Sequence, residues 1–146
     1  MAEADDLEAL VIPSSVKVAG GMLAGAGVCI GITGLQALGL TTTGLYSLVG
    51  PVAIVLSGGC VFAGAGVVRG RARAALLGLG VGAVTGLFAI AWVVLAFLNG
   101  VISFIALLAV PLSITATTLI AVGLKAVRTV DAARERLRAQ GLDAGL

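Results

Sequence analysis

The chain contains, from Val18 to Leu40, the stretch VAGGMLAGAGVCIGITGLQALGL, in which no side chain is charged. This stretch opens a longer uncharged segment that ends at Val68, and a second uncharged segment runs from Ala74 to Leu124. Each of the two segments is 51 residues long. A helix needs about 20 apolar residues to cross the hydrocarbon core of a bilayer. Each segment therefore predicts two membrane spans that are joined by a short turn.

The composition of the whole chain also indicates a membrane protein. Hydrophobic residues make up 60% of the 146 residues and charged residues only 11%, whereas a soluble domain carries about 25% charged residues. Gly contributes 22 residues, and its usual share is roughly 7%. Transmembrane strands would need alternating polar and apolar residues over about 10 positions, and the sequence has no such segment. We therefore expect an all-α, polytopic membrane protein.

Turn signals divide each uncharged segment into two. The first segment is interrupted by Thr41–Gly44, which contains three hydroxyl side chains and a glycine, and the second by the turn dipeptide Asn99-Gly100. These turns predict four transmembrane helices as two antiparallel hairpins, over residues 18–40, 45–68, 74–98 and 101–124. The expected organisation is an acidic cytoplasmic N-terminal segment 1–17, a four-helix transmembrane domain 18–124 and a basic cytoplasmic tail 125–146.

The basic residues predict the orientation, because four spans would place all nine of them on one side of the membrane. Lys17 precedes the first span, and the others follow the second or the fourth span. The positive-inside rule assigns this side to the cytoplasm, so we expect both termini inside and the bacterial inner (plasma) membrane as the location. We assign a role in topology and headgroup contact to Arg69, Arg71, Arg73, Lys125, Arg128, Arg134, Arg136 and Arg138.

The tail has an amphipathic pattern, which predicts a short cytoplasmic amphipathic C-terminal helix that continues from the last span. Its apolar residues recur at helical spacing, namely Val127, Val130, Ala133 and Leu137. Such a helix can lie on anionic headgroups, dock on a partner or extend into solvent, and the sequence leaves these alternatives open. The acidic segment 3–17 can fold back over the basic linker 69–73.

Small residues recur at spacings of three and four along the first three spans. This pattern, a glycine zipper, places small side chains on one helix face, where backbones can approach closely in lipid. The predicted helix-packing interface comprises Gly20, Ala24, Gly27, Gly31, Gly34, Ala53, Ser57, Cys60, Gly64, Gly78, Gly82, Gly86 and Ala89. The span 101–124 contains many bulky residues and a single Gly, so we expect it to be peripheral. We expect Pro111 to kink it.

The first span has small residues on more than one face, because Gly21 and Gly25 form a second GxxxG pair beside the main stripe. A helix of this kind can touch two partners. One interpretation is oligomerisation or docking to another membrane subunit. The other is a helix that passes through the centre of its own bundle, and the sequence does not separate the two.

The residues that usually carry chemistry are largely missing from this sequence. The chain has no His, which removes the commonest metal ligand and general base. The two thiols, Cys29 and Cys60, lie in apolar mid-span surroundings, where Cys acts as a small packing residue. No span contains Asp, Glu, Lys or Arg. Ion-coupled carriers usually have such ionisable residues within their spans, so their absence argues against this class. We therefore expect no enzyme, no cofactor and no bound metal. We also expect no nucleic acid as a partner, since no basic patch is interleaved with aromatic residues.

These features favour a non-catalytic structural or accessory subunit of a membrane assembly or homo-oligomer, built through Gly/Ala-mediated helix packing. The expected partners are membrane lipids and other membrane subunits or further copies of the chain. Two alternatives remain open from the sequence. One is a pore-forming or channel protein of the holin-like kind, and the other is a carrier of a neutral or lipidic substrate.

Overall fold

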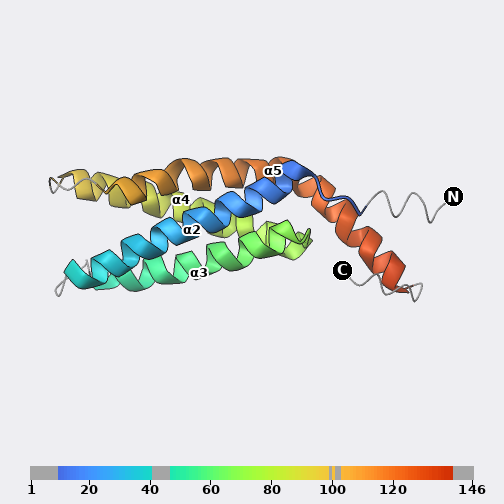
Figure 1. The fold of residues 1–146 in the computed structure, drawn as a ribbon, viewed down its shortest axis with the longest axis horizontal. Coiled ribbons are helices and arrows are strands. Elements are labelled where there is room, and N and C mark those ends of the chain that lie inside the picture. Colours follow the sequence, from blue (N-terminus) through green and yellow to red (C-terminus); the bar gives the residue numbers. More distant parts are fainter. Residues whose placement is uncertain (1–9, 41–46, 99, 101–102, 140–146) are drawn as a thin grey trace.

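The computed structural model describes residues 10–40, 47–98, 100 and 103–139. In these residues the fold consists of four α-helices, each long and apolar enough to cross a membrane (Figure 1). They are α2 (Ser14–Leu40), α3 (Val49–Val68), α4 (Ala72–Leu98) and α5 (Phe104–Ala139). The chain is thus an all-α integral membrane protein. The turn expected at Thr41–Gly44, the residue Asn99 and most of the acidic N-terminal segment lie outside the described residues.

The first residue of each helix differs from the expected one by two to four residues, and the earlier start of α2 has a local cause. α2 begins directly after Pro13, whose carbonyl accepts hydrogen bonds from the N–H groups of Val16 and Lys17 at 3.0 and 3.2 Å. Proline is tolerated at the start of a helix, because the N–H that it lacks would have no acceptor within the first helical turn. α5 is a single helix of 36 residues that continues through Pro111 and past residue 124 into the tail.

A tight turn connects α3 to α4. The N–H of Gly70 donates to the carbonyl of Val67 at 2.9 Å, and the N–H of Arg71 donates to the carbonyl of Gly66 at 3.1 Å. Gly70 has a φ of +69°, a conformation that a residue without a Cβ adopts readily. This pair of bonds is the Schellman motif. It ends α3 and reverses the chain within three residues.

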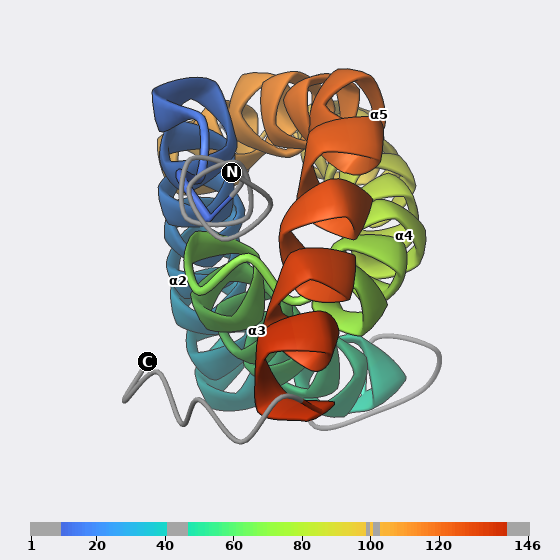
Figure 2. The ribbon, with the colours of Figure 1, turned by 90° about the vertical axis from the view of Figure 1, so that its right-hand side faces the viewer.

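The four helices are arranged so that each packs against two neighbours. α2 packs against α3 and α5, α4 packs against α5 and α3, and the diagonal contact between α2 and α4 is slight (Figure 2). The interior between the helices is filled by side chains, of which Leu23, Ile30, Val67 and Ile120 are almost completely buried. α2 is the helix with the largest share of buried residues.

The expectation that the last span is peripheral is wrong, because α5 packs against both α2 and α4. Its bulky residues lie on one face: Phe104 is 70% exposed and Leu108 is 58% exposed. The opposite face carries small residues at spacings of three and four, and it is buried. These buried small residues are Ala106, Ala109, Ser113 and Ala116, and the bulkier Ile120 follows them on the same buried face.

The last third of α5 changes direction and crosses one end of the bundle (Figures 1 and 2). The residues on its inner face are buried, namely Val127, Val130, Ala133 and Leu137. A Cβ added to Gly70 would lie 2.8 Å from Ile12 and 3.4 Å from Val130, so three segments meet here. We call this the basic end, and it comprises the start of α2, residues 69–73 and α5 from Lys125 onward.

Candidate functional site

The contact between α2 and α3 is made by backbones that approach each other closely. A Cβ added to Gly27 would lie 2.7 Å from the Cβ of Cys60 and 2.9 Å from the carbonyl oxygen of Ser57. A Cβ added to Gly64 would lie 2.5 Å from the carbonyl oxygen of Gly20. The structure places along this contact Gly20, Ala24, Gly27, Gly31 and Gly34 of α2 and Ala53, Ser57, Cys60 and Gly64 of α3.

The small residues of α4 meet α5 and α2. A Cβ added to Gly82 would lie 2.5 Å from Oγ1 of Thr117 and 3.2 Å from Cδ1 of Leu23, so side chains form this contact. Gly78 approaches Leu23 and Ile120 in the same way. Gly86, the third predicted position of α4, lies against Ser113. The fourth, Ala89, belongs to a buried cluster with Ile30, Ala53 and Ala109.

Other glycines of the spans point away from the bundle. Gly21, Gly58 and Gly80 are exposed, and a Cβ added to any of them would meet no atom within 4 Å. A Cβ at Gly25 would reach only Leu112, at 4.0 Å. The bundle therefore makes little use of the Gly21 and Gly25 pair.

Several polar groups inside the spans form hydrogen bonds within the chain. The hydroxyl of Thr33 donates to the carbonyl of Cys29 in its own helix at 2.9 Å. The hydroxyl of Thr85 lies 3.2 Å from Sγ of Cys60, which joins α4 to α3 through two buried side chains. Both cysteines are free thiols. Among the described residues, no group of three or more His, Cys, Asp or Glu side chains is placed to hold a metal ion.

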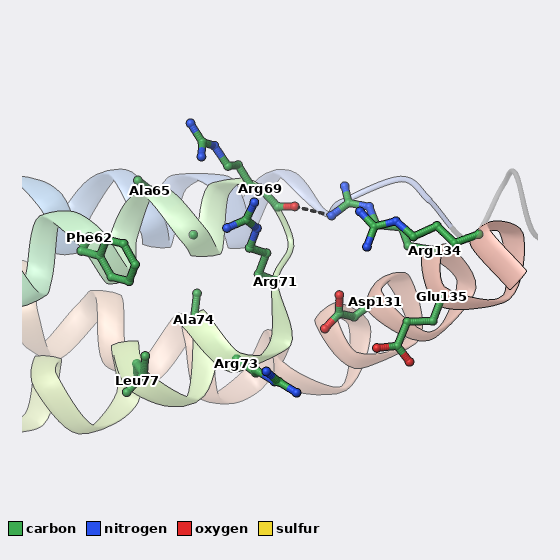
Figure 3. Close-up of a pocket in the computed structure, with 12 residues that line it drawn as sticks. Phe62, Ala65, Arg69, Arg71, Arg73, Ala74, Leu77, Asp131, Arg134 and Glu135 are labelled. Atoms are coloured by element: carbon green, nitrogen blue, oxygen red, sulfur yellow. Dashed lines mark hydrogen bonds between the residues drawn. The ribbon is translucent and has the colours of Figure 1, made fainter. Parts of the chain in front are cut away.

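At the basic end, α5 binds both sides of the turn between α3 and α4. The carboxylate of Asp131 accepts a hydrogen bond from the N–H of Ala72, the first residue of α4, at 3.1 Å. Nη1 of Arg134 donates to the carbonyl of Arg69, which follows the last residue of α3 (Figure 3). A negative group at a helix N-terminus and a positive group at a helix C-terminus are both favourable. α5 thus fixes the turn with two charged side chains one helical turn apart.

A cavity of about 800 Å³ lies beside this turn, between α3, α4 and the last third of α5. Its apolar side is formed by residues of α3 and α4, including Phe62, Ala65, Ala74 and Leu77 (Figure 3). Five of the eight basic residues expected at the membrane surface line it, namely Arg69, Arg71, Arg73, Arg134 and Arg138. The other three, Lys125, Arg128 and Arg136, are exposed at the same end but do not line the cavity.

Sequence reasoning missed this cavity and the charged contacts beside it. Asp131 and Arg134 are three residues apart, which places them on one side of a helix. Nothing in the spacing indicates that this helix turns back across the bundle. The signal that was available is the apolar face of the tail, because buried residues such as Val130 require something to pack on.

Comparison of the chain with protein-family models, with curated proteins and with solved structures gives no match. The functions of the helix-packing interface and of the cavity at the basic end are therefore inferred from the chemistry of their residues.

Proposed function

We propose that the chain is a non-catalytic structural or accessory subunit, which binds other membrane proteins or further copies of itself through helix faces that its own bundle leaves open. The observation that carries this proposal is that some glycines lie at close helix contacts within the bundle, whereas others lie on its open faces. Gly27 and Gly64 allow close contact within the bundle, whereas a Cβ added to Gly21, Gly58 or Gly80 would meet no atom of the described residues within 4 Å. A helical Gly costs roughly 0.5–1 kcal/mol relative to Ala. Close packing against a partner helix would offset that cost at the outer positions.

The proposal includes a finer membrane arrangement. Two antiparallel hairpins, α2 with α3 and α4 with the part of α5 that precedes Lys125, would span the bacterial inner membrane with the basic end in the cytoplasm. The positive-inside rule supports this orientation, since the described basic residues gather at that end. The last third of α5 would be an amphipathic cytoplasmic segment. Its arginines would contact lipid headgroups, so membrane lipids are the second class of partner.

The test is the mass of the complex in mild detergent, measured by native mass spectrometry on chains that carry two different tags. We expect a stoichiometric complex, with either a second copy or another subunit. The variants Gly21→Leu and Gly58→Leu should reduce the complex at least tenfold without lowering the unfolding temperature. Val28→Leu is the matched control, because Val28 is 53% exposed on α2 and already has a branched side chain. A monomer in all preparations would contradict the proposal.

Of the two alternative functions, the structure offers a specific observation only for a carrier of a lipidic substrate. The cavity at the basic end has an apolar side and a charged side, as a site for an amphiphile requires. A pore within one chain is disfavoured, because Leu23, Ile30 and Ile120 fill the bundle interior. Reconstituted vesicles with a fluorescent phospholipid separate the candidates, since a carrier moves the lipid across the bilayer and an accessory subunit does not.

A further inference from the structure

We infer that the cavity at the basic end is a binding site for one anionic phospholipid molecule. Its phosphate would lie among the arginines, and its acyl chains would lie against the apolar wall between α3 and α4. This inference rests on the membrane orientation proposed above and is independent of the proposed protein partner.

The charges that line the cavity favour an anion. Five arginines face two carboxylates there, those of Asp131 and Glu135, which leaves a net charge of +3. Asp131 is already bound to the N–H of Ala72. Arginine presents paired N–H groups that match phosphate oxygens in geometry as well as charge. Basic pockets between transmembrane helices at the cytoplasmic side are suited to anionic headgroups.

One arginine of the cavity lining is held in a fixed position by the turn. Nη1 of Arg134 donates to the carbonyl of Arg69, while its Nε is closed to solvent and has no hydrogen-bond partner among the described residues. A phosphate in the open cavity would therefore bind the other N–H groups of this guanidinium and not Nε. The guanidinium is already held in place by the turn, so little side-chain freedom would be lost on binding.

The apolar wall distinguishes a lipid from a soluble anion. Phe62 is 72% exposed and Leu77 is 55% exposed, and both lie on the bundle side of the arginines (Figure 3). Phe62 precedes Arg69 by seven residues, which is about 10 Å along a helix. The lining therefore changes from charged to apolar over the distance that separates a headgroup from the start of its acyl chains. A free phosphate would leave this wall unused.

The test is a titration of the full chain in detergent, followed by native mass spectrometry, with phosphatidylglycerol and phosphatidylcholine of identical acyl chains. We expect one phosphatidylglycerol molecule to bind, with at least a tenfold preference over phosphatidylcholine. The double variant Arg71→Gln, Arg73→Gln should lose at least tenfold in affinity. The matched control Arg128→Gln, Arg136→Gln removes the same charge from the same end, and it should change affinity less than twofold. Equal losses in the two variants would overturn the site, because they would indicate diffuse attraction.

A second arm identifies the source of the phosphate. Soluble glycerol 3-phosphate should bind at least a hundredfold more weakly than the lipid, and Leu77→Asn should weaken lipid binding severalfold without affecting glycerol 3-phosphate. Equal affinity for the two ligands would overturn the assignment to a lipid. The unfolding temperature of each variant shows whether it is folded. If the double variant Arg71→Gln, Arg73→Gln does not fold, Leu77→Asn serves as the test. The loss of protein partners in Gly21→Leu is measured separately, so either proposal can fail alone.

Discussion

The two packed faces of α3 differ in what they bring into contact. Toward α2, a Cβ at Gly64 would lie 2.5 Å from a backbone oxygen of Gly20. Toward α4, a Cβ at Gly59 would lie 3.2 Å from Cγ1 of Val81, a side-chain atom. The first contact is continuous along the helix, whereas the second is looser at Gly59 and becomes close again only beside the turn, where a Cβ at Gly66 would overlap the Cβ of Ala74. At mid-span, one face is therefore closed by backbone and the other by side chains.

This difference shows that a stripe of small residues is not sufficient for close approach. Both surfaces must be small at the same height along the bundle. α2 and α3 meet this condition along their lengths, because Gly27 faces Ser57 and Cys60 and Gly34 faces Ala53. Backbone atoms cannot rotate away from an added side chain, but a valine side chain can shift. The comparison can therefore be tested with substitutions on the same helix.

The largest effect is expected for Gly64→Leu. The added side chain would meet the backbone of α2, so the two helices would have to separate and lose their dispersion contacts. We expect a loss of about 3 kcal/mol or more in unfolding free energy, measured by thermal or denaturant unfolding in detergent. Gly58→Leu is the matched control, because it adds the same side chain to the open face of the same helix. Equal destabilisation by both variants would mean that the α2–α3 contact is not the tight one.

A smaller loss is expected for Gly59→Leu at the contact with α4. The nearest atom is the end of a side chain, so Val81 can adjust before the helices move. We expect a loss of about 1–2 kcal/mol, measured by the same unfolding experiment. Gly80→Leu on the open face of α4 should be close to neutral. A loss as large as that of Gly64→Leu would show that the two faces of α3 are equally closed.

The sequence predicts the membrane class and the number of spans, because uncharged segments and interrupted apolar runs are properties of the chain itself. It also predicts which residues share a face, such as Gly27 and Gly31. It does not predict which face meets which helix. The buried stripe of α5 was missed for that reason, since Ala109 and Ala116 are less conspicuous than Gly and stand beside bulky outward residues. The cavity was missed because it depends on where α5 turns.

The hydrogen bond between Asp131 of α5 and the turn that joins α3 to α4 predicts a moderate loss of stability when this side chain is removed. Asp131→Ala removes the carboxylate from the N–H of Ala72, and with it a favourable charge at the start of α4. We expect a loss of about 1 kcal/mol in unfolding free energy, and a smaller loss in high salt. Glu135→Ala is the control, because Glu135 also lines the cavity, whereas the N–H of Ala72 is bound by Asp131. Identical effects of the two substitutions would contradict a specific cap.

The smallest effect concerns a polar link between the buried surfaces of α3 and α4, the contact of Thr85 with Cys60. Thr85→Val removes the hydroxyl that lies 3.2 Å from Sγ of Cys60 while it keeps the side-chain volume. Hydrogen bonds between transmembrane helices contribute about 0.6 kcal/mol on average, and a thiol is a weak partner, so we expect no more than this. A double-mutant cycle with Cys60→Ala isolates the pair, because the cavity left by the missing sulfur appears in both branches and cancels. A coupling energy well above 1 kcal/mol would mean that polar contact, and not side-chain packing, holds the looser face of α3 together.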